Sequence, residues 1–267
     1  MSTLLNRAAR AIWTFHQPLT RLPRTPSTPL SDLFLWRDDE EWKTYFELTD
    51  MVGMFGEGTG PQGDISAELV FFDQFGRETG NKTVSAPSYK RKVLSIGELL
   101  GAGHPKMGTF CVLHKKTPDR IKSLGSSLAE RGYVSFCYRQ APLRSYVHGN
   151  LDAVAKGPEG KIERLGGASL LGREYRLQYE LRRGRRYEIA LVNASPQQQK
   201  VVCELLDSQS NRRLVIRTEA DMPSGGCHAF TIVPEQESTR IVIKSHLVMA
   251  RPLVFCFDGD TLDALHG

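Results

Sequence analysis

From residue 33 onward, short stretches of the chain alternate between apolar and polar residues. Alternation with a period of two is typical of β-strands that have one buried face. Turns rich in glycine and charged residues, such as residues 73–76, separate these stretches. The pattern predicts an all-β protein of short antiparallel strands. The predicted strands include residues 42–48, 67–72, 108–114, 133–139, 187–195, 201–207 and 251–257.

Two segments show the spacing of three and four residues between apolar side chains that is typical of an amphipathic helix. The first covers residues 3–15, and the second lies within residues 117–131. Four prolines between residues 17 and 31 predict an extended linker, because proline lacks the backbone N–H that helices and sheets need. We therefore expect one short N-terminal helix and one helix inserted among the strands.

The second half of the chain repeats a pattern of the first half. Residues 141–154 and 251–265 share a Pro-Leu pair, a glycine six positions after that leucine and a Leu-Asp-Ala triplet. Upstream, residues 35–48 parallel residues 180–191, and the order along the chain is preserved. Self-similarity of this kind indicates repeated modules. The sequence thus predicts two tandem antiparallel β-sandwich modules of jelly-roll or immunoglobulin-like type.

This repeat divides the chain into four parts. They are a basic arm with its proline-rich linker, a first sandwich, a glycine-rich linker and a second sandwich, at residues 1–31, 32–157, 158–171 and 172–267. The first module has about 24 more residues than the second, and residues 97–107 and the helix within 117–131 account for them. Added loops of this kind either carry a function of their own or cover exposed sheet edges.

Positive charge is concentrated at the N-terminal end. The 267 residues include 35 basic and 30 acidic side chains, which gives a net charge of +5. Arg7, Arg10, Arg21 and Arg24 supply four of these charges, and the first 30 residues contain no acid. The nearly neutral remainder argues against a nucleic-acid-binding protein. No apolar run approaches the about 20 residues of a membrane-spanning helix.

The candidate metal and cofactor motifs are incomplete. The five cysteines are widely spaced and form no metal-binding pair, so we expect reduced, buried thiols in a cytoplasmic protein. Residues 58–63 match the glycine pattern of a dinucleotide site, but a predicted strand follows where a helix is needed. Residues 258–263 begin like a calcium loop and lack its later ligands. We expect no cofactor, no metal and no catalytic residue.

Residues 144–152 are the most polar part of the repeated segment. The candidate ligand-binding residues are Arg144, Tyr146, His148, Asn150 and Asp152. Alternation along a strand would place the first three on one face, where they would stack on a sugar or a carboxylate ligand and hydrogen bond to it. The other interpretation is that Tyr146 and His148 pack where the two modules meet.

Two basic segments are candidate partner-binding sites. Arg182, Arg183, Arg185 and Arg186 surround one predicted hairpin turn, which is either solvated or contacts a phosphate or an acidic partner. The arm, residues 1–15 with Trp13, either contacts a membrane surface or a partner groove, or docks on this chain or on a neighbouring subunit. Acidic residues 38–41 occupy the turn of the first module that corresponds to the arginine turn. Opposite charges on equivalent turns predict head-to-tail association, either between chains or between the two copies of one chain, and we expect a homo-oligomer.

Several of these segments resemble the small β-sandwich domains of the sensory rhodopsin transducer family. The resemblance rests on residues 187–195, residues 201–207 and residues 251–257 followed by Leu262-Asp263, and it covers about 80 residues of each half. It implies a cytosolic, non-catalytic, oligomeric protein that is related in shape to carbohydrate-binding sandwiches. Two fused copies and an arginine-rich arm differ from the single domain of that family.

The sequence therefore predicts a non-catalytic binding or adaptor protein that recognises a glycan or a protein partner. One alternative is a carbohydrate-active enzyme, in which two carboxylates among Asp73, Asp152, Glu47 and Asp64 meet in a cleft. A second alternative is a scaffold subunit whose main contact is another copy of itself.

Overall fold

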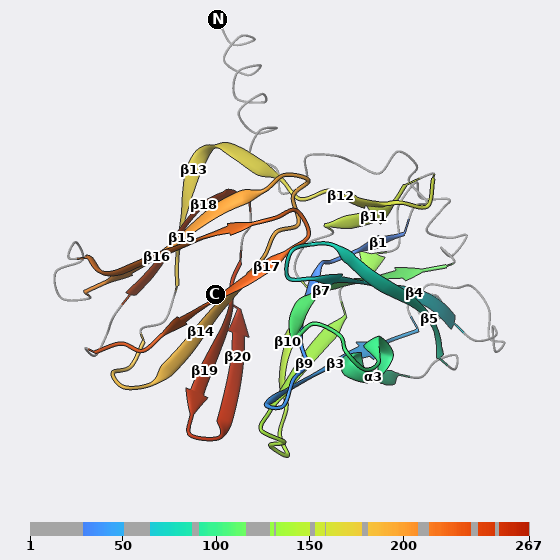
Figure 1. Cartoon of the computed structure of the whole chain (residues 1–267), viewed down its shortest axis with the longest axis horizontal. Helices are drawn as coiled ribbons and strands as arrows, with labels where there is room; N and C mark the ends of the chain where they lie inside the picture. The colour runs from blue at the N-terminus through green and yellow to red at the C-terminus, as the bar shows by residue number, and fades with distance from the viewer. Residues whose placement is uncertain are drawn as a thin grey trace, which may run out of the picture.

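Nearly all residues that the structure describes lie in β-strands or in the turns between them (Figure 1). The computed structural model describes residues 29–50, 65–86, 91–115, 129–130, 132–149, 153–157, 159–177, 181–207, 214–235, 240–248 and 251–266. In these ranges the only helix is α3 (Ile96–Leu100), at the start of a segment predicted as a loop. The helix predicted at residues 3–15 lies outside the described residues. Most of the helix predicted within 117–131 does too, except that Ala129–Glu130 form strand β8.

The described strands form five sheets of four strands each. Sheet I has the order β12 (Ile162–Arg164), β11 (Val154–Lys156), β1 (Leu30–Ser31) and β8, and sheet II has the order β2 (Phe34–Arg37), β7 (Met107–His114), β4 (Ile65–Asp73) and β5 (Glu78–Ala86). Sheet III has the order β10 (Ser145–His148), β9 (Tyr133–Tyr138), β3 (Trp42–Leu48) and β6 (Lys92–Ser95). Sheet IV has the order β17 (Cys227–Ile232), β14 (Arg186–Val192), β19 (Leu253–Asp258) and β20 (Thr261–His266). Sheet V has the order β13 (Ala168–Arg176), β18 (Arg240–Leu247), β15 (Gln199–Leu206) and β16 (Leu214–Met222).

The prediction of two tandem β-sandwich modules, and with it the sandwich fold that the family resemblance implies, is wrong. The chain instead forms a five-bladed, propeller-like arrangement of small sheets. Its blades are not runs of consecutive strands, because β2 and β3 follow each other in the chain but belong to sheets II and III. Alternation of apolar residues shows which face of a strand is buried, but it does not show which distant strand pairs with it. The predicted glycine-rich linker contains β12 and the start of β13.

Strand order is nevertheless the same in two pairs of sheets. Strands β2, β7, β4 and β5 of sheet II correspond in chain order to β13, β18, β15 and β16 of sheet V. Strands β6, β3, β9 and β10 of sheet III correspond to β17, β14, β19 and β20 of sheet IV. By strand order, β10 of the first half corresponds to β20 of the second half. The Pro-Leu pairs of the sequence repeat instead align β10 with β19. Sheet I belongs to neither pair.

One hydrophobic cluster contains residues of both halves of the chain, residues 29–164 and 165–266, while a second cluster lies within the second half. The ring of Trp42 in sheet III is buried against Phe255 and Phe257 of β19, at centroid distances of 5.1 and 5.7 Å. Phe136 packs edge-on against Phe255 at 4.9 Å. The other face of sheet IV, which includes Ile189, packs on sheet V. Sheet IV is therefore covered on both faces, by sheet III on one and by sheet V on the other.

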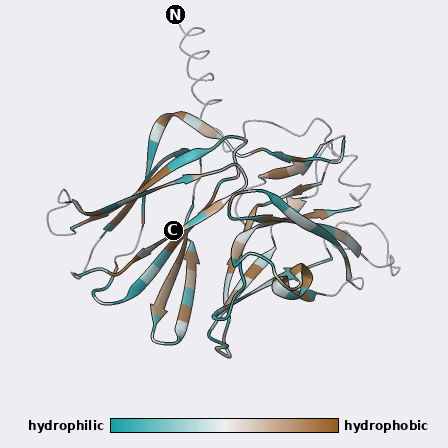
Figure 2. Ribbon diagram, viewed as in Figure 1, coloured by the Kyte–Doolittle hydropathy of each residue, from teal (hydrophilic) through white to brown (hydrophobic). Residues whose placement is uncertain are grey.

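Hydrogen bonds and an ion-pair network cross the same boundary. Strands β10 and β20 lie side by side (Figure 1), and the Ser145 hydroxyl donates to the carbonyl of Leu262 at 2.7 Å. The buried carboxylate of Glu188 in β14 forms ion pairs with Arg37 of β2 and with Arg186. Apolar residues lie on strands of both halves where they meet (Figure 2). A buried carboxylate needs such partners, because losing one leaves an uncompensated charge.

We expect Trp42→Ala to lower the free energy of unfolding of the whole chain by about 3–5 kcal/mol, as for other buried tryptophans. Because the ring contacts both halves, the variant should still unfold in one transition. Urea unfolding followed by circular dichroism measures both quantities. Phe75→Ala, which removes a ring that is 52% exposed, is the control and should change stability by less than about 0.5 kcal/mol. A second transition at the wild-type midpoint would contradict the shared core.

Candidate functional site

The outer face of sheet III carries three tyrosines and a histidine. Tyr146 and His148 are exposed on β10, where Val147 between them is buried. The register places Tyr146 opposite Ser135 of β9, and Ser135 opposite Tyr45 of β3. His148 lies opposite Tyr133, and the two rings meet edge to face at 6.4 Å. We call Tyr45, Tyr133, Tyr146 and His148 the tyrosine face.

Exposure on this face is high for aromatic side chains. Tyr133 is 52% exposed and Tyr146 is 49% exposed. Large aromatic rings bury much area when they contact a partner, and they lose little side-chain entropy in doing so. The sequence predicted Tyr146 and His148 as site residues. It gave no sign of Tyr45 or Tyr133, because cross-strand register brings them there.

Arg144 borders the tyrosine face from the turn before β10. Its guanidinium group lies 3.6 Å from the centre of the Tyr45 ring, a cation–π contact that fixes the side chain over the sheet. Among the described residues, Arg144 has no carboxylate partner. The arginine is exposed, so its positive charge is available to a ligand. Asn150 and Asp152, the other two predicted ligand-binding residues, lie outside the described residues.

Other charges near this face are already paired. Arg91 forms an ion pair with the buried carboxylate of Glu47 at 2.9 Å, and Lys43 pairs with Asp38 at 2.8 Å. Asp73 pairs with Arg77 at 2.7 Å, at the end of β4 in sheet II. Glu47 and Asp73 were two of the carboxylates predicted for a carbohydrate-active enzyme, and they belong to different sheets. The other two, Asp64 and Asp152, lie outside the described residues.

The arginine turn meets acidic groups of its own chain. Arg185 pairs with Asp258 at 2.8 Å, and Arg186 pairs with Glu188. The Tyr138 hydroxyl lies 3.3 Å from the Glu41 carboxylate and 3.5 Å from the Arg186 guanidinium, so the acidic and arginine turns approach each other within one molecule. Arg182 and Arg183 are exposed. Trp13 lies outside the described residues, and association between chains stays a prediction.

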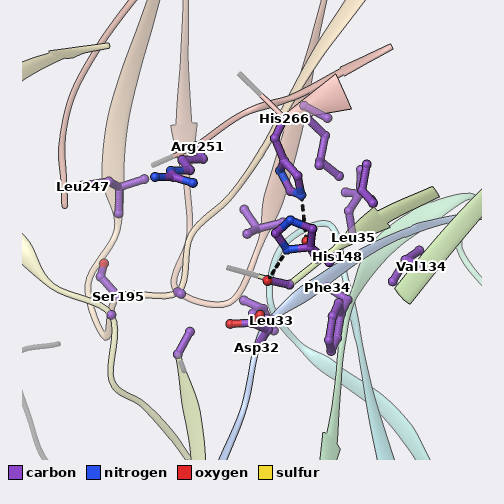
Figure 3. A pocket seen from close by; sticks show the side chains of 18 of the residues that line it. Asp32, Leu33, Phe34, Leu35, Val134, His148, Ser195, Leu247, Arg251 and His266 are labelled. Atoms are coloured by element: carbon purple, nitrogen blue, oxygen red, sulfur yellow. Dashed lines mark hydrogen bonds between the residues drawn. The ribbon is translucent and has the colours of Figure 1, made fainter. Parts of the chain in front are cut away.

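A cavity of about 110 Å³ lies between the two halves (Figure 3). We call it the seam cavity. Its wall is mainly apolar and includes Leu33, Val134, Val147, Ala190, Val192 and Leu247. Polar side chains at its border are Asp32, His148, Ser195, Arg251 and His266. This cavity could not be predicted from the sequence, because residues of four sheets and their loops form it.

His266 and His148 link the seam cavity to the tyrosine face. The Nε2–H of His266 donates to the carbonyl of His148 at 2.7 Å, and the ring centroids are 5.0 Å apart. Burial lowers the pKa of His266, and the nearby charges of His148 and Arg251 lower it further. The hydrogen bond to His148 opposes this effect. His266 is therefore held in its neutral form.

The described cysteines are free and mostly buried. Burial raises the pKa of the thiols of Cys111, Cys203 and Cys227 to about 12. Thiols with such values are poor nucleophiles, because the thiolate is the reactive form. Within the described ranges, no group of three or more histidine, cysteine or acidic side chains is placed to hold a metal ion. The helix found there is too short to cross a membrane.

No protein-family model matches the chain, and no curated protein matches its sequence. The resemblance to sensory rhodopsin transducer domains is therefore an expectation that no comparison tests.

The pKa of His266 predicts how stability depends on pH. Because this pKa is lower in the folded chain than in the unfolded chain, the unfolded state binds the proton more readily below about pH 6.5. The free energy of unfolding should be highest above that pH and should fall as the pH is lowered through the folded pKa. His228, whose pKa burial also lowers, contributes in the same direction.

Urea unfolding of the wild type and variants at about pH 7.5 and about pH 5.5 measures this effect. His266→Gln, which keeps an N–H donor without a titrating ring, should lose less stability at the lower pH than the wild type. Phe75→Ala is the control, since it removes an exposed ring that does not titrate, and it should show the wild-type loss. If the wild type and His266→Gln lost the same free energy of unfolding at the lower pH, His266 would not be the source of the pH dependence.

Proposed function

We propose that this chain is a binding protein that recognises an acidic glycan through the tyrosine face. The observation that carries the proposal is the pair of half-exposed rings of Tyr133 and Tyr146 beside Arg144, an arginine without a carboxylate partner among the described residues. The rings supply a stacking surface, and the arginine supplies a charged hydrogen-bond donor. The tyrosines belong to sheet III, and the contact with the Tyr45 ring holds Arg144 beside them, so both features are positioned before a ligand arrives.

The spacing of the two rings suits neighbouring sugar residues. Tyr146 lies opposite Ser135, which makes Tyr133 its diagonal neighbour on β9. Diagonal neighbours on adjacent strands are about 7–8 Å apart. The C–H faces of sugar rings pack on aromatic rings, while their hydroxyl groups bond to polar side chains at the edge. His148 is placed for such bonds because its imidazole is exposed beside Tyr133.

The polar groups on this face favour a glycan over a protein partner. Protein interfaces have a continuous apolar centre that becomes fully buried. On the tyrosine face, Ser135 lies between Tyr146 and Tyr45, and the ion-paired Glu47 lies next to Tyr133. Ser135 and Glu47 interrupt the apolar surface between the rings but are themselves buried. The exposed polar groups that a sugar hydroxyl can reach beside the rings are His148 and Arg144.

The charge of Arg144 favours an acidic sugar. Of the arginines near sheet III, Arg91 is neutralised by Glu47, whereas Arg144 has only the Tyr45 ring against it. A carboxylate of a uronic acid would accept hydrogen bonds from this guanidinium, and charge-assisted bonds are about twice as strong as neutral ones. Neutral glycans would then bind through the rings alone and more weakly.

A glycan array followed by calorimetry tests this proposal, and we expect binding of oligosaccharides that contain uronic acids. Tyr133→Ala and Tyr146→Ala should each weaken binding about tenfold, or about 1.4 kcal/mol, through loss of stacking. Arg144→Gln should weaken binding of acidic glycans and leave neutral ones unchanged. All three residues are exposed, so melting temperatures should change little.

Phe75→Ala is the matched control for this experiment. Phe75 is as exposed as Tyr133 and also has an arginine, Arg77, over its ring, but it lies in the turn between β4 and β5 of sheet II. Its loss should not change glycan binding. An array without any bound glycan, or equal binding by the Tyr146→Ala variant, would contradict the proposal. If a protein partner bound the tyrosine face and no glycan did, a protein-binding role would replace the proposed glycan-binding role.

A further inference from the structure

The seam cavity has the size and lining of a small-ligand site. An engineered apolar cavity of about 150 Å³ stays dry and binds benzene. The seam cavity has about 110 Å³ and an apolar wall from both halves, including Val134, Ala190 and Leu247. One aromatic ring or a short branched aliphatic chain would fill it.

Arg251 gives the cavity a charged side. It lies in the segment before β19, borders the cavity and is exposed. In the described part of the chain it has no acidic partner. Most other arginines at the boundary between the halves do, including Arg37, Arg186 and Arg139. An unpaired guanidinium beside an apolar cavity matches a ligand that has an apolar body and a carboxylate.

The other polar groups determine how such a ligand lies. Asp32 is a buried carboxylate, and Figure 3 shows it away from Arg251 across the cavity. Neutral His266 has its Nε2–H occupied by the His148 carbonyl, so it does not compete with Arg251 for the ligand. The carboxylate would therefore lie at Arg251, and the apolar body would point between the halves.

We propose that the seam cavity binds a small aromatic or branched aliphatic monocarboxylate, with its carboxylate on Arg251 and its apolar body among Val134, Ala190 and Leu247. This site adjoins the tyrosine face through His148, but the proposed ligand contacts Arg251 and apolar residues that are not part of that face. Because its wall comes from both halves, a bound ligand stabilises their contact, and binding raises the melting temperature by mass action.

Benzoate is the probe, and toluene is its neutral counterpart of similar size. We expect calorimetry on the full chain to show saturable binding of benzoate and weaker binding of toluene, and benzoate to raise the melting temperature. Arg251→Gln should lower benzoate affinity at least tenfold without changing toluene binding. Arg183→Gln removes an exposed arginine far from the cavity wall and is the matched control, with wild-type binding of both probes.

A second variant tests the apolar part of the site. Ala190→Leu places a larger side chain in the cavity wall and should abolish binding of both probes, while its melting temperature without ligand shows whether it folds. If that variant does not fold, the benzoate affinity of Arg251→Gln alone tests the proposal. Arg251 is exposed, so its substitution should leave the fold intact. Absence of benzoate binding to the wild type at about 10 mM would overturn the proposal. Equal affinity of Arg251→Gln for benzoate would also overturn it.

The glycan proposal fails or succeeds independently of these results. Tyr146→Ala should bind benzoate as the wild type does, because Tyr146 does not border the cavity. Loss of benzoate binding in that variant would contradict a site between the halves.

Discussion

The contact of Trp42 with Phe255 and Phe257 is the interaction on which the rest of the structure depends. It joins sheet III to the face of sheet IV that would otherwise face solvent. Burial of large aromatic rings contributes more to stability than any single polar contact at the boundary. Because this contact fixes β19 beside sheet III, it also determines that β20 lies beside β10 and that the seam cavity lies between the halves.

The polar groups at the boundary between the halves add specificity to this core. Glu188 is buried between Arg37 of the first half and Arg186 of the second. A buried ion pair adds little stability on its own, but a shifted arrangement of the halves would leave the carboxylate uncompensated. The hydrogen bond from the Thr109 hydroxyl to the carbonyl of Gly225, at 2.6 Å, imposes the same constraint between sheet II and the second half. The core therefore holds the halves together, and these pairs fix how they are aligned.

The sequence predicted the long strands β3, β4, β7, β14 and β15, but neither β13, β16 and β18 nor the sheets that the strands form. The short strands of sheet I are only two or three residues long, which is too short for a periodic pattern. The run Val254-Phe-Cys-Phe257 has no polar alternation, and such a run is typical of a strand buried on both faces. Strand β19 is indeed packed on both faces, but such a pattern does not identify Trp42 as the partner. For the same reason Tyr146 and His148 could be predicted from local alternation, whereas Tyr45, Tyr133 and the wall of the seam cavity depend on pairings between distant segments.

Native-state hydrogen exchange tests the shared core most directly, because it gives an opening free energy for each amide. If Trp42, Phe255 and Phe257 unite the halves, the slowest amides of β3 and β9 should have the same opening free energy as those of β14 and β19, and all should equal the global free energy of unfolding. Two distinct values, with β14 and β19 remaining protected after β3 and β9 have opened, would contradict the account and would show that the second half is stable on its own.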